Sequence, residues 1–284
     1  MIGLLEDYIR NNWQNLHMPF SAPKRLSYFF LKGFRKTIFF IFKDDDRHPF
    51  AVFKATNDPI AFDRLKREYE TLSYLSANES LKGTVPLPLA FFEMSKHTCL
   101  LESALDGTPM VYAIKGIRSK RELRKMKVFF TLVVDFLVSL SQKREKAENE
   151  HPERSVVEHG DFNPPNIFVS ENGIKIFDWE YSNMSGIPLH DLLDFSLKYV
   201  LFARYLAHEV TREKPVLNDF EEAFLSQKPH SDIIWQNITI YKEKVDISTS
   251  SMQDCFSDFS IKYLSEPDAS RFCKELDTVI LSSL

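Results

Sequence analysis

Cysteine is scarce and scattered in this chain of 284 residues. Its three cysteines, Cys99, Cys255 and Cys273, are odd in number and lie far apart in the sequence. Such spacing favours reduced thiols over a disulfide framework or a zinc site. Reduced thiols are typical of intracellular proteins, and we therefore expect a cytoplasmic location.

Long apolar runs and an excess of positive charge are also missing. The longest apolar run, residues 128–140, contains Asp135 and is too short to span a bilayer, so it predicts a buried helix. Residues 1–13 carry charges where a secretion signal needs an apolar core. The formal net charge of −4 argues against a general nucleic-acid binder. We therefore expect neither a membrane nor a nucleic acid among the partners.

The residues that are present predict an α+β fold with two unequal lobes. Hydrophobic residues make up 44% of the chain and include 25 Phe, so a substantial core is expected. Asp58 is placed to cap a helix, and the break at residues 106–109 marks the point after which helical patterns dominate. We expect an N-terminal lobe over residues 1–102 and a C-terminal lobe over residues 103–284. The β-rich runs of the first lobe are residues 26–33, 37–43, 49–54, 89–94 and 98–105.

The stretch VEHGDFNPPNIFVSENGIKIFDWE, residues 157–180, is unusually polar for two short strands. Asp161 lies in a loop, Asn166 follows five residues later, and Asn172-Gly173 predicts a tight turn between two strands. Asp178 ends the second strand, so the hairpin is expected to bring Asp178 near Asn166. Carboxylate and amide oxygens suit Mg²⁺, and one carboxylate would remain free to accept a proton.

HGDFNPPNIF followed by IFDWE resembles the aminoglycoside phosphotransferase and choline kinase-like family, whose members are relatives of the protein kinases. The resemblance implies a two-lobed, protein kinase-like fold and covers roughly residues 26–200. It implies transfer of the γ-phosphoryl group of ATP, with GTP as an alternative donor, to an alcohol hydroxyl of a small acceptor. That acceptor would be an aminoglycoside, an amino alcohol or a sugar. Asp161 would be the catalytic base, and Asn166 and Asp178 would hold Mg²⁺.

The same resemblance implies nucleotide-binding residues in the N-terminal lobe. Lys54 would hold the α- and β-phosphates and would pair with Glu68, for which Glu70 is a rival on the same predicted helix. Backbone groups of Glu102 and Ala104 would bind the purine edge.

Two further parts of the family pattern concern loops. The loop over the phosphates, residues 31–37, departs from the pattern because Gly33 is its only glycine, so Arg35 or Lys36 would assist there. Asp191 would brace the loop that carries Asp161. His159 is expected to order that loop, and Trp179 to pack beside the metal site.

Two alternatives stay open. A catalytically inactive kinase-like protein would keep the fold as a nucleotide-binding or scaffold module, although such proteins usually lose one of the residues found here. A protein kinase is disfavoured by Gly160, by the Asp-Trp-Glu at residues 178–180 and by the lack of an Ala-Pro-Glu segment. A monomer or a homodimer is expected.

The charge distribution bears on the acceptor. Residues 215–284 contain 12 acidic and 6 basic residues, whereas residues 1–102 contain 12 acidic and 14 basic ones. An acidic C-terminal region favours a cationic acceptor. The alternative is that acids such as Asp219, Glu221 and Glu222 only form solvated helix faces.

Overall fold

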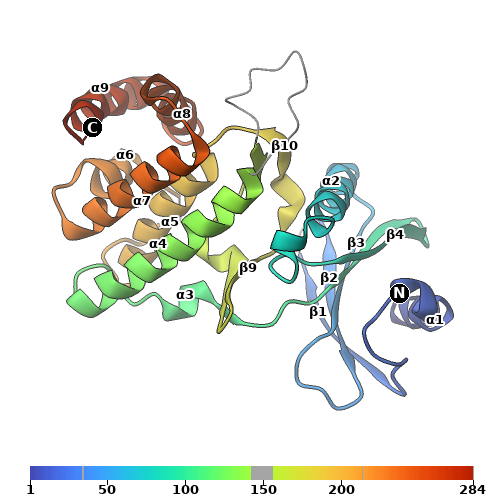
Figure 1. Cartoon of the computed structure of the whole chain (residues 1–284). Helices are drawn as coiled ribbons and strands as arrows, with labels where there is room; N and C mark the ends of the chain where they lie inside the picture. The colour runs from blue at the N-terminus through green and yellow to red at the C-terminus, as the bar shows by residue number, and fades with distance from the viewer. Residues whose placement is uncertain (34, 142–155, 213, 284) are drawn as a thin grey trace. The chain divides into compact units, whose positions relative to one another are not determined.

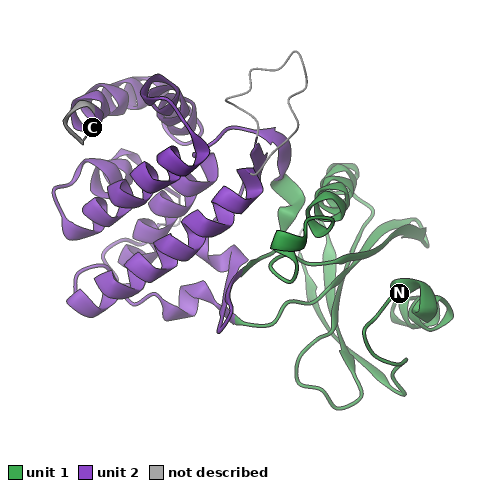
Figure 2. Cartoon of the chain, viewed as in Figure 1, with its two compact units in different colours: residues 1–107, 175–181 green, residues 108–174, 182–284 purple. Residues whose placement is uncertain are grey.

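The computed structural model describes residues 1–33, 35–141, 156–212 and 214–283. The chain divides into two compact units, which Figure 2 colours separately. Unit 1 comprises Met1–Gly107 and Lys175–Tyr181, and unit 2 comprises Thr108–Ile174 and Ser182–Leu284. The division therefore falls after Gly107 rather than after residue 102. Lys175–Tyr181 joins unit 1 because its backbone bonds there, for example through Ile176 N–H to Thr84 O at 2.8 Å.

Unit 1 contains a five-stranded antiparallel sheet with the strand order β1-β2-β3-β5-β4. Each strand lies largely within one of the five β-rich runs predicted from the sequence, whose Phe, Ile, Val and Thr residues favour extended backbone. The strands are β1 (Leu26–Lys32), β2 (Thr37–Lys43), β3 (Ala51–Thr56), β4 (Pro88–Met94) and β5 (His97–Ser103).

The two faces of this sheet differ in character. On one face Phe39, Phe53 and Leu101 form a core with Leu5 and Ile9 of the first helix. Side chains alternate between faces along a strand, so the even-numbered residues of β3 and β5 face the opposite side. The helical segments of unit 1 are α1 (Ile2–Asn12), η1 (Trp13–Leu16), α2 (Pro59–Ser76), η2 (Glu79–Leu81) and η4 (Trp179–Tyr181).

Helix α2 begins as the sequence predicts. The Asp58 side chain accepts hydrogen bonds from the N–H groups of Ile60 and Ala61 at 2.9 and 3.1 Å. Such a cap stabilises the start of a helix, because it satisfies N–H groups that have no partner within the helix. Helix α2 packs on β3, β4 and β5.

Unit 2 is mostly helical. Helix α4 packs against α7, and α8 packs against α9 (Figure 1). The apolar run at residues 128–140 lies in α4, where Phe130 and Val133 are fully buried, as predicted. Within the described ranges, no helix is both long and apolar enough to cross a membrane. The helical segments are α3 (Met110–Ala113), α4 (Lys120–Ser141), η3 (Pro164–Asn166), α5 (His190–Leu206), α6 (Leu217–Phe220), η5 (Glu221–Leu225), α7 (Pro229–Val245), α8 (Thr249–Ile261) and α9 (Glu266–Ser283).

Short strands complete unit 2. β8 and β9 flank a turn at residues 171–172, so the predicted hairpin is present, and β6 pairs with the far side of β8. β10 pairs with β7. The strands are β6 (Thr108–Pro109), β7 (Val156–Glu158), β8 (Ile167–Ser170), β9 (Gly173–Ile176, which continues into unit 1) and β10 (Asn183–Gly186). The predicted α+β fold, β-rich at the N-terminus and helical at the C-terminus, is confirmed.

Candidate active site

Lys54 is the centre of a buried ion cluster in unit 1. Its Nζ lies 2.7 Å from Glu68 Oε1 and 3.0 Å from Glu102 Oε1. The strand register explains the second contact: Lys54 lies opposite Leu100, so Glu102, two residues further along β5, projects from the same face. Glu68 comes from α2, which packs on β3. Glu70, the rival partner, is exposed and lies 3.8 Å from Lys66, so Glu68 is the residue that pairs with Lys54.

Burial and the neighbouring charges shift the pKa values of this cluster in opposite directions. Burial alone would lower the pKa of Lys54, but the carboxylates around it raise that pKa well above its ordinary value. Burial raises the pKa of Glu68 to about 7, and burial also raises the pKa of Glu102. The second carboxyl oxygen of each glutamate is buried without a hydrogen-bond partner among the described residues. A cluster built in this way is poorly suited to stabilising a fold, and such clusters are typical of functional sites.

Asp178 follows β9 and adds a third carboxylate to the cluster. Its Oδ1 lies 3.6 Å from Lys54 Nζ, and its φ of +66° is a left-handed conformation that aspartate tolerates. The next residue, Trp179, is fully buried as predicted, and its N–H donates to Glu68 Oε1 at 2.9 Å. Glu68 therefore holds both Lys54 and the chain beside Asp178.

A second lysine reaches Asp178 from the turn between β1 and β2. Lys36 Nζ lies 3.2 Å from Asp178 Oδ1 and 2.7 Å from Glu180 Oε2. Burial alone would lower the pKa of Lys36, whereas the charge of Asp178 raises it, with a net upward shift. Lys36 thus places a cation against the carboxylate predicted to bind metal. Phe34, in the same predicted phosphate loop, lies outside the described residues.

One of the backbone groups predicted to contact the purine edge already has a partner. The N–H of Ala104 donates to Phe50 O at 3.0 Å, because the backbone continues the sheet beyond the end of β5. That N–H is therefore not available to a purine in this structure. The next N–H, of Leu105, makes no hydrogen bond to any residue that the structure describes. Glu102 enters the cluster through its side chain, a contact that sequence reasoning missed because it depends on the strand register.

In unit 2, Asp161 lies in the loop between β7 and η3. Its Oδ1 accepts hydrogen bonds from Lys198 Nζ at 2.7 Å and from Asn163 Nδ2 at 2.8 Å. Its Oδ2 accepts one from Asn166 Nδ2 at 3.1 Å. Burial alone would raise the pKa of Asp161, but the charge and hydrogen bond of Lys198 lower it below its ordinary value. The lowered pKa means that Asp161 is ionised at neutral pH.

Asn166 is oriented by the same loop. Its Nδ2 also donates to the Asp161 carbonyl at 3.0 Å, and its own N–H bonds to Asn163. Its Oδ1 accepts no hydrogen bond from any described residue, so this oxygen is available as a metal ligand. Asn166 belongs to unit 2 and Asp178 to unit 1, and their predicted proximity stays a prediction.

Asp191 braces the loop that carries Asp161, as predicted. It accepts hydrogen bonds from the N–H groups of His159 at 2.6 Å and of Gly160 at 3.1 Å. Gly160 has a φ of +80°, in the left-handed region that favours glycine. His159 is fully buried, and its Nδ1 accepts the N–H of Asp161 at 3.3 Å, which fits the ordering role expected for it.

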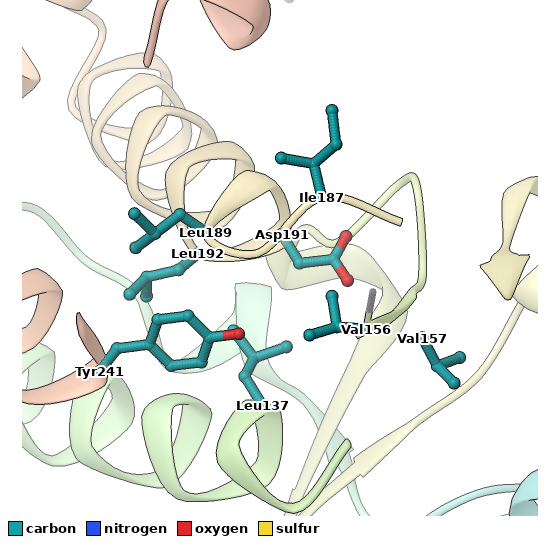
Figure 3. Close-up of a pocket in the computed structure, with 8 residues that line it drawn as sticks. All are labelled: Leu137, Val156, Val157, Ile187, Leu189, Asp191, Leu192 and Tyr241. Atoms are coloured by element: carbon teal, nitrogen blue, oxygen red, sulfur yellow. The ribbon is translucent and has the colours of Figure 1, made fainter. Parts of the chain in front are cut away.

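Asp191 also lines a small cavity (Figure 3). Burial raises the pKa of Asp191 to about 8, and the charge of Glu158 adds to the rise, while the two N–H groups oppose it. The cavity measures ≈ 10 Å³, about the minimum for one water molecule. It is therefore too small to hold an acceptor. Its lining consists of Leu137, Val156, Val157, Ile187, Leu189, Asp191, Leu192 and Tyr241.

Sequence reasoning missed Lys198, the strongest partner of Asp161. Lys198 also contacts Asp194 at 2.9 Å, one helical turn earlier on α5. The i,i+4 spacing of an acid and a lysine directly after Asp191 was an available signal. It indicates a helical ion pair, however, and not a contact with a loop 37 residues away.

The three acids named as examples of solvated helix faces form ion pairs. Asp219 is fully buried and lies 2.8 Å from Arg204 and 3.0 Å from Arg212. Glu222 lies 2.7 Å from Lys228, and Glu221 lies 3.2 Å from Arg271. Asp219 thus forms no solvated face. The cationic acceptor was inferred from the overall charge of the region, and it stays a prediction.

Part of the chain is similar to a known protein family. Residues 136–217 match the model of the phosphotransferase enzyme family. Among solved structures, the aminoglycoside phosphotransferase APH(3'')-Id from Streptomyces rimosus is 13% identical, covers 88% of this chain and 91% of its own, and has a TM-score of 0.47. A search of curated proteins found no match. The matched residues include Asp161, Asn166 and Asp178, so the predicted similarity to phosphotransferases is confirmed over this part of the chain.

Proposed function

We propose that this protein is a small-molecule kinase that moves the γ-phosphoryl group of ATP to an alcohol hydroxyl. The observation that carries the proposal is the cluster in unit 1. Lys54, Glu68 and Asp178 come from a strand, a helix and the end of a hairpin, and they meet within 3.6 Å of Lys54 Nζ. A lysine set by a glutamate and a nearby metal-binding aspartate is the arrangement that holds the phosphates of ATP in kinases.

The residues fit Mg²⁺ and a nucleotide. Asp178 offers a carboxylate and Asn166 an amide oxygen, which are ligands that Mg²⁺ accepts, and nucleotide phosphates and water would supply the others. Within the described residues, no group of three or more His, Cys, Asp or Glu side chains is arranged to hold a metal ion. Bound Mg²⁺ would neutralise charge on the phosphates and orient the γ-phosphoryl group for in-line attack.

The side chains of this chain would divide the remaining work. Lys54 would bind the α- and β-phosphates and be kept in place by Glu68. Asp161 would orient the acceptor hydroxyl and take its proton at Oδ1 or Oδ2. The lowered pKa of Asp161 keeps it ionised at neutral pH, so the base needs no prior activation.

A catalytically inactive kinase-like protein is the second candidate. The contact of Lys36 with Asp178 and Glu180 favours it, because a protein cation lies against the predicted metal ligand. The two candidates differ in turnover: an inactive protein binds nucleotide and leaves ATP unconsumed.

The deciding experiment is an ATP-consumption screen. The protein is incubated with MgATP and a panel of aminoglycosides, amino alcohols and sugars, and ADP is measured. Asp161→Asn serves as the blank. Acceptor-dependent ADP release by the native chain, absent from Asp161→Asn, supports the kinase. Nucleotide binding without ADP release from any acceptor supports the inactive candidate.

A further inference from the structure

Two adjacent residues just beyond α8 contact the loop of Asp161 and helix α5. Lys262 Nζ lies 3.3 Å from the carbonyl oxygen of Gly160, directly before Asp161. The hydroxyl of Tyr263 donates a hydrogen bond to Asp194 on α5. Both contacts lie within unit 2, and they connect the C-terminal helices to the predicted base.

Hydrogen bonds continue from Tyr263 to Asp161 without a gap. Asp194 receives Tyr263 on Oδ1 and Lys198 Nζ on Oδ2, the latter at 2.9 Å. The same Nζ donates to Asp161 Oδ1 at 2.7 Å. Asp194 is 1% exposed, so it has little access to water as a substitute partner.

Each member of this series limits the freedom of the next. A lysine side chain loses much rotamer entropy when it is fixed, so one contact with a partly exposed carboxylate holds it weakly. A second, buried carboxylate fixes Lys198 between two defined oxygens. Asp194 is in turn oriented by Tyr263, whose ring packs against the buried Phe220 and Phe259. Burial, supported by Asp194, raises the pKa of Tyr263, so its hydroxyl stays protonated and remains a donor.

We propose that Tyr263 is a positioning residue for the catalytic base, acting on Asp161 through Asp194 and Lys198. This inference rests on the proposed function, in which Asp161 accepts the proton of the acceptor. It assigns a task to the C-terminal region, outside the residues matched by the family model. Without the Tyr263 hydroxyl, the side chains of Lys198 and Asp161 are held less firmly in one conformation. This slows the chemical step and leaves nucleotide binding intact.

The experiment is a double-mutant cycle measured by turnover. ADP release from MgATP is followed with the best acceptor of the screen, or with water as acceptor, for Tyr263→Phe, Lys198→Met and the double variant. Tyr263→Phe removes only the hydroxyl and keeps the ring in its aromatic contacts. Tyr112→Phe, an exposed tyrosine of α3, is the matched control. If Lys198→Met does not fold, Asp194→Asn replaces it in the cycle.

We expect Tyr263→Phe to lower kcat about tenfold and Lys198→Met about a hundredfold, with the KM for ATP unchanged. The double variant should be no slower than Lys198→Met, because Tyr263 acts through Lys198. Lys198→Arg should recover most of the rate, since a guanidinium can bond both carboxylates. Tyr112→Phe should match the native chain.

The outcomes distinguish a failure of this inference from a failure of the proposed function on which it rests. Unchanged kcat in Tyr263→Phe, or its full additional loss in the Lys198→Met background, overturns the positioning role. If Asp161→Asn nevertheless abolishes turnover in the same assay, the proposed function is still supported, without the positioning role of Tyr263. If the native chain releases no ADP, both the proposed function and this inference are wrong. If Asp161→Asn is as fast as the native chain, the role of Asp161 as base and this inference are wrong.

Discussion

A lysine between carboxylates occurs in both units, and the carboxylates respond in opposite ways. In unit 1 Glu68 shares Lys54 with Glu102, and its pKa rises to about 7. In unit 2 Asp161 shares Lys198 with Asp194, and its pKa falls. The distances to lysine are the same, 2.7 Å in each case. The direction of the pKa shift therefore does not follow from the ion pair itself.

Burial explains the difference. The Glu68 side chain is fully buried, whereas the Asp161 side chain is 36% exposed and also accepts two amide hydrogen bonds. Desolvation outweighs the lysine in the first case, and the lysine and amide donors outweigh desolvation in the second. Asp161 is therefore fully ionised at neutral pH, whereas Glu68 titrates near it.

The largest effect is expected at Asp161. Asp161→Asn should lower kcat by about 10²–10⁴-fold, the usual contribution of a positioned general base. The measurement is acceptor-dependent ADP release. Asp135→Asn, which removes an exposed acid of unit 2, is the control and should leave the rate unchanged. Near-native turnover in Asp161→Asn would show that another group takes the proton.

The next effect concerns the partner of Lys54. Glu68→Gln should lower kcat/KM for ATP by about tenfold, because it removes the charge that sets the lysine and weakens the contact to Trp179. Glu70→Gln is the matched control on the same helix and should lose less than twofold, roughly the scale of an exposed pair. A larger loss at Glu70 than at Glu68 would contradict the assignment.

A third effect is a pH dependence of stability at Asp191. Its pKa is raised to about 8 in the fold, so the folded chain binds this proton more tightly than the unfolded chain does. The contribution of Asp191 to stability is fully present below its unfolded pKa and is lost as pH rises through about 8. Between pH 6 and 8 the native chain should lose on the order of 2 kcal/mol relative to Asp191→Asn.

Urea unfolding of the native chain and Asp191→Asn at several pH values checks this prediction. Since the amide side chain of the variant does not titrate, the difference between the two free energies of unfolding isolates the carboxyl. A difference that stays constant from pH 6 to 8, or that grows in favour of the native chain, would show that the two N–H bonds keep Asp191 ionised.

The smallest effect is expected at Lys36. Lys36→Met removes the cation that lies against Asp178, so the Mg²⁺ concentration giving half-maximal turnover should fall about fivefold, equivalent to roughly 1 kcal/mol. Lys32→Met, on the exposed end of β1, is the control. A higher Mg²⁺ requirement would instead indicate that Lys36 contributes to nucleotide binding, as the sequence suggested for the phosphate loop.

The parts of the site that the sequence predicts are those with local signatures. Asp161 and Asn166 lie five residues apart in one motif, and the family resemblance carried by that motif implies the Lys54–Glu68 pair. Glu102 as a side-chain partner depends on the pairing of β3 with β5, and the hydrogen bond of the Ala104 N–H depends on the continuation of that sheet. Tyr263 lies 69 residues from Asp194, and only the packing of α5 and α8 brings them together.

The same distinction applies to the fold. The β-rich runs and the α2 cap could be read from residue patterns, because extended backbone and helix ends have local requirements. The assignment of Lys175–Tyr181 to unit 1 could not, since it depends on contacts with Glu68 and Thr84, distant in sequence.

The central claim is a division of labour: the unit 1 cluster binds the metal–nucleotide complex, and Asp161 acts on the acceptor. The most direct test is MgATP binding by calorimetry to the native chain, Asp161→Asn and Asp178→Ala. The account predicts that Asp161→Asn binds within about threefold of the native Kd while Asp178→Ala loses at least about tenfold, or 1.4 kcal/mol. Equal weakening in both variants, or a larger loss in Asp161→Asn, would contradict it.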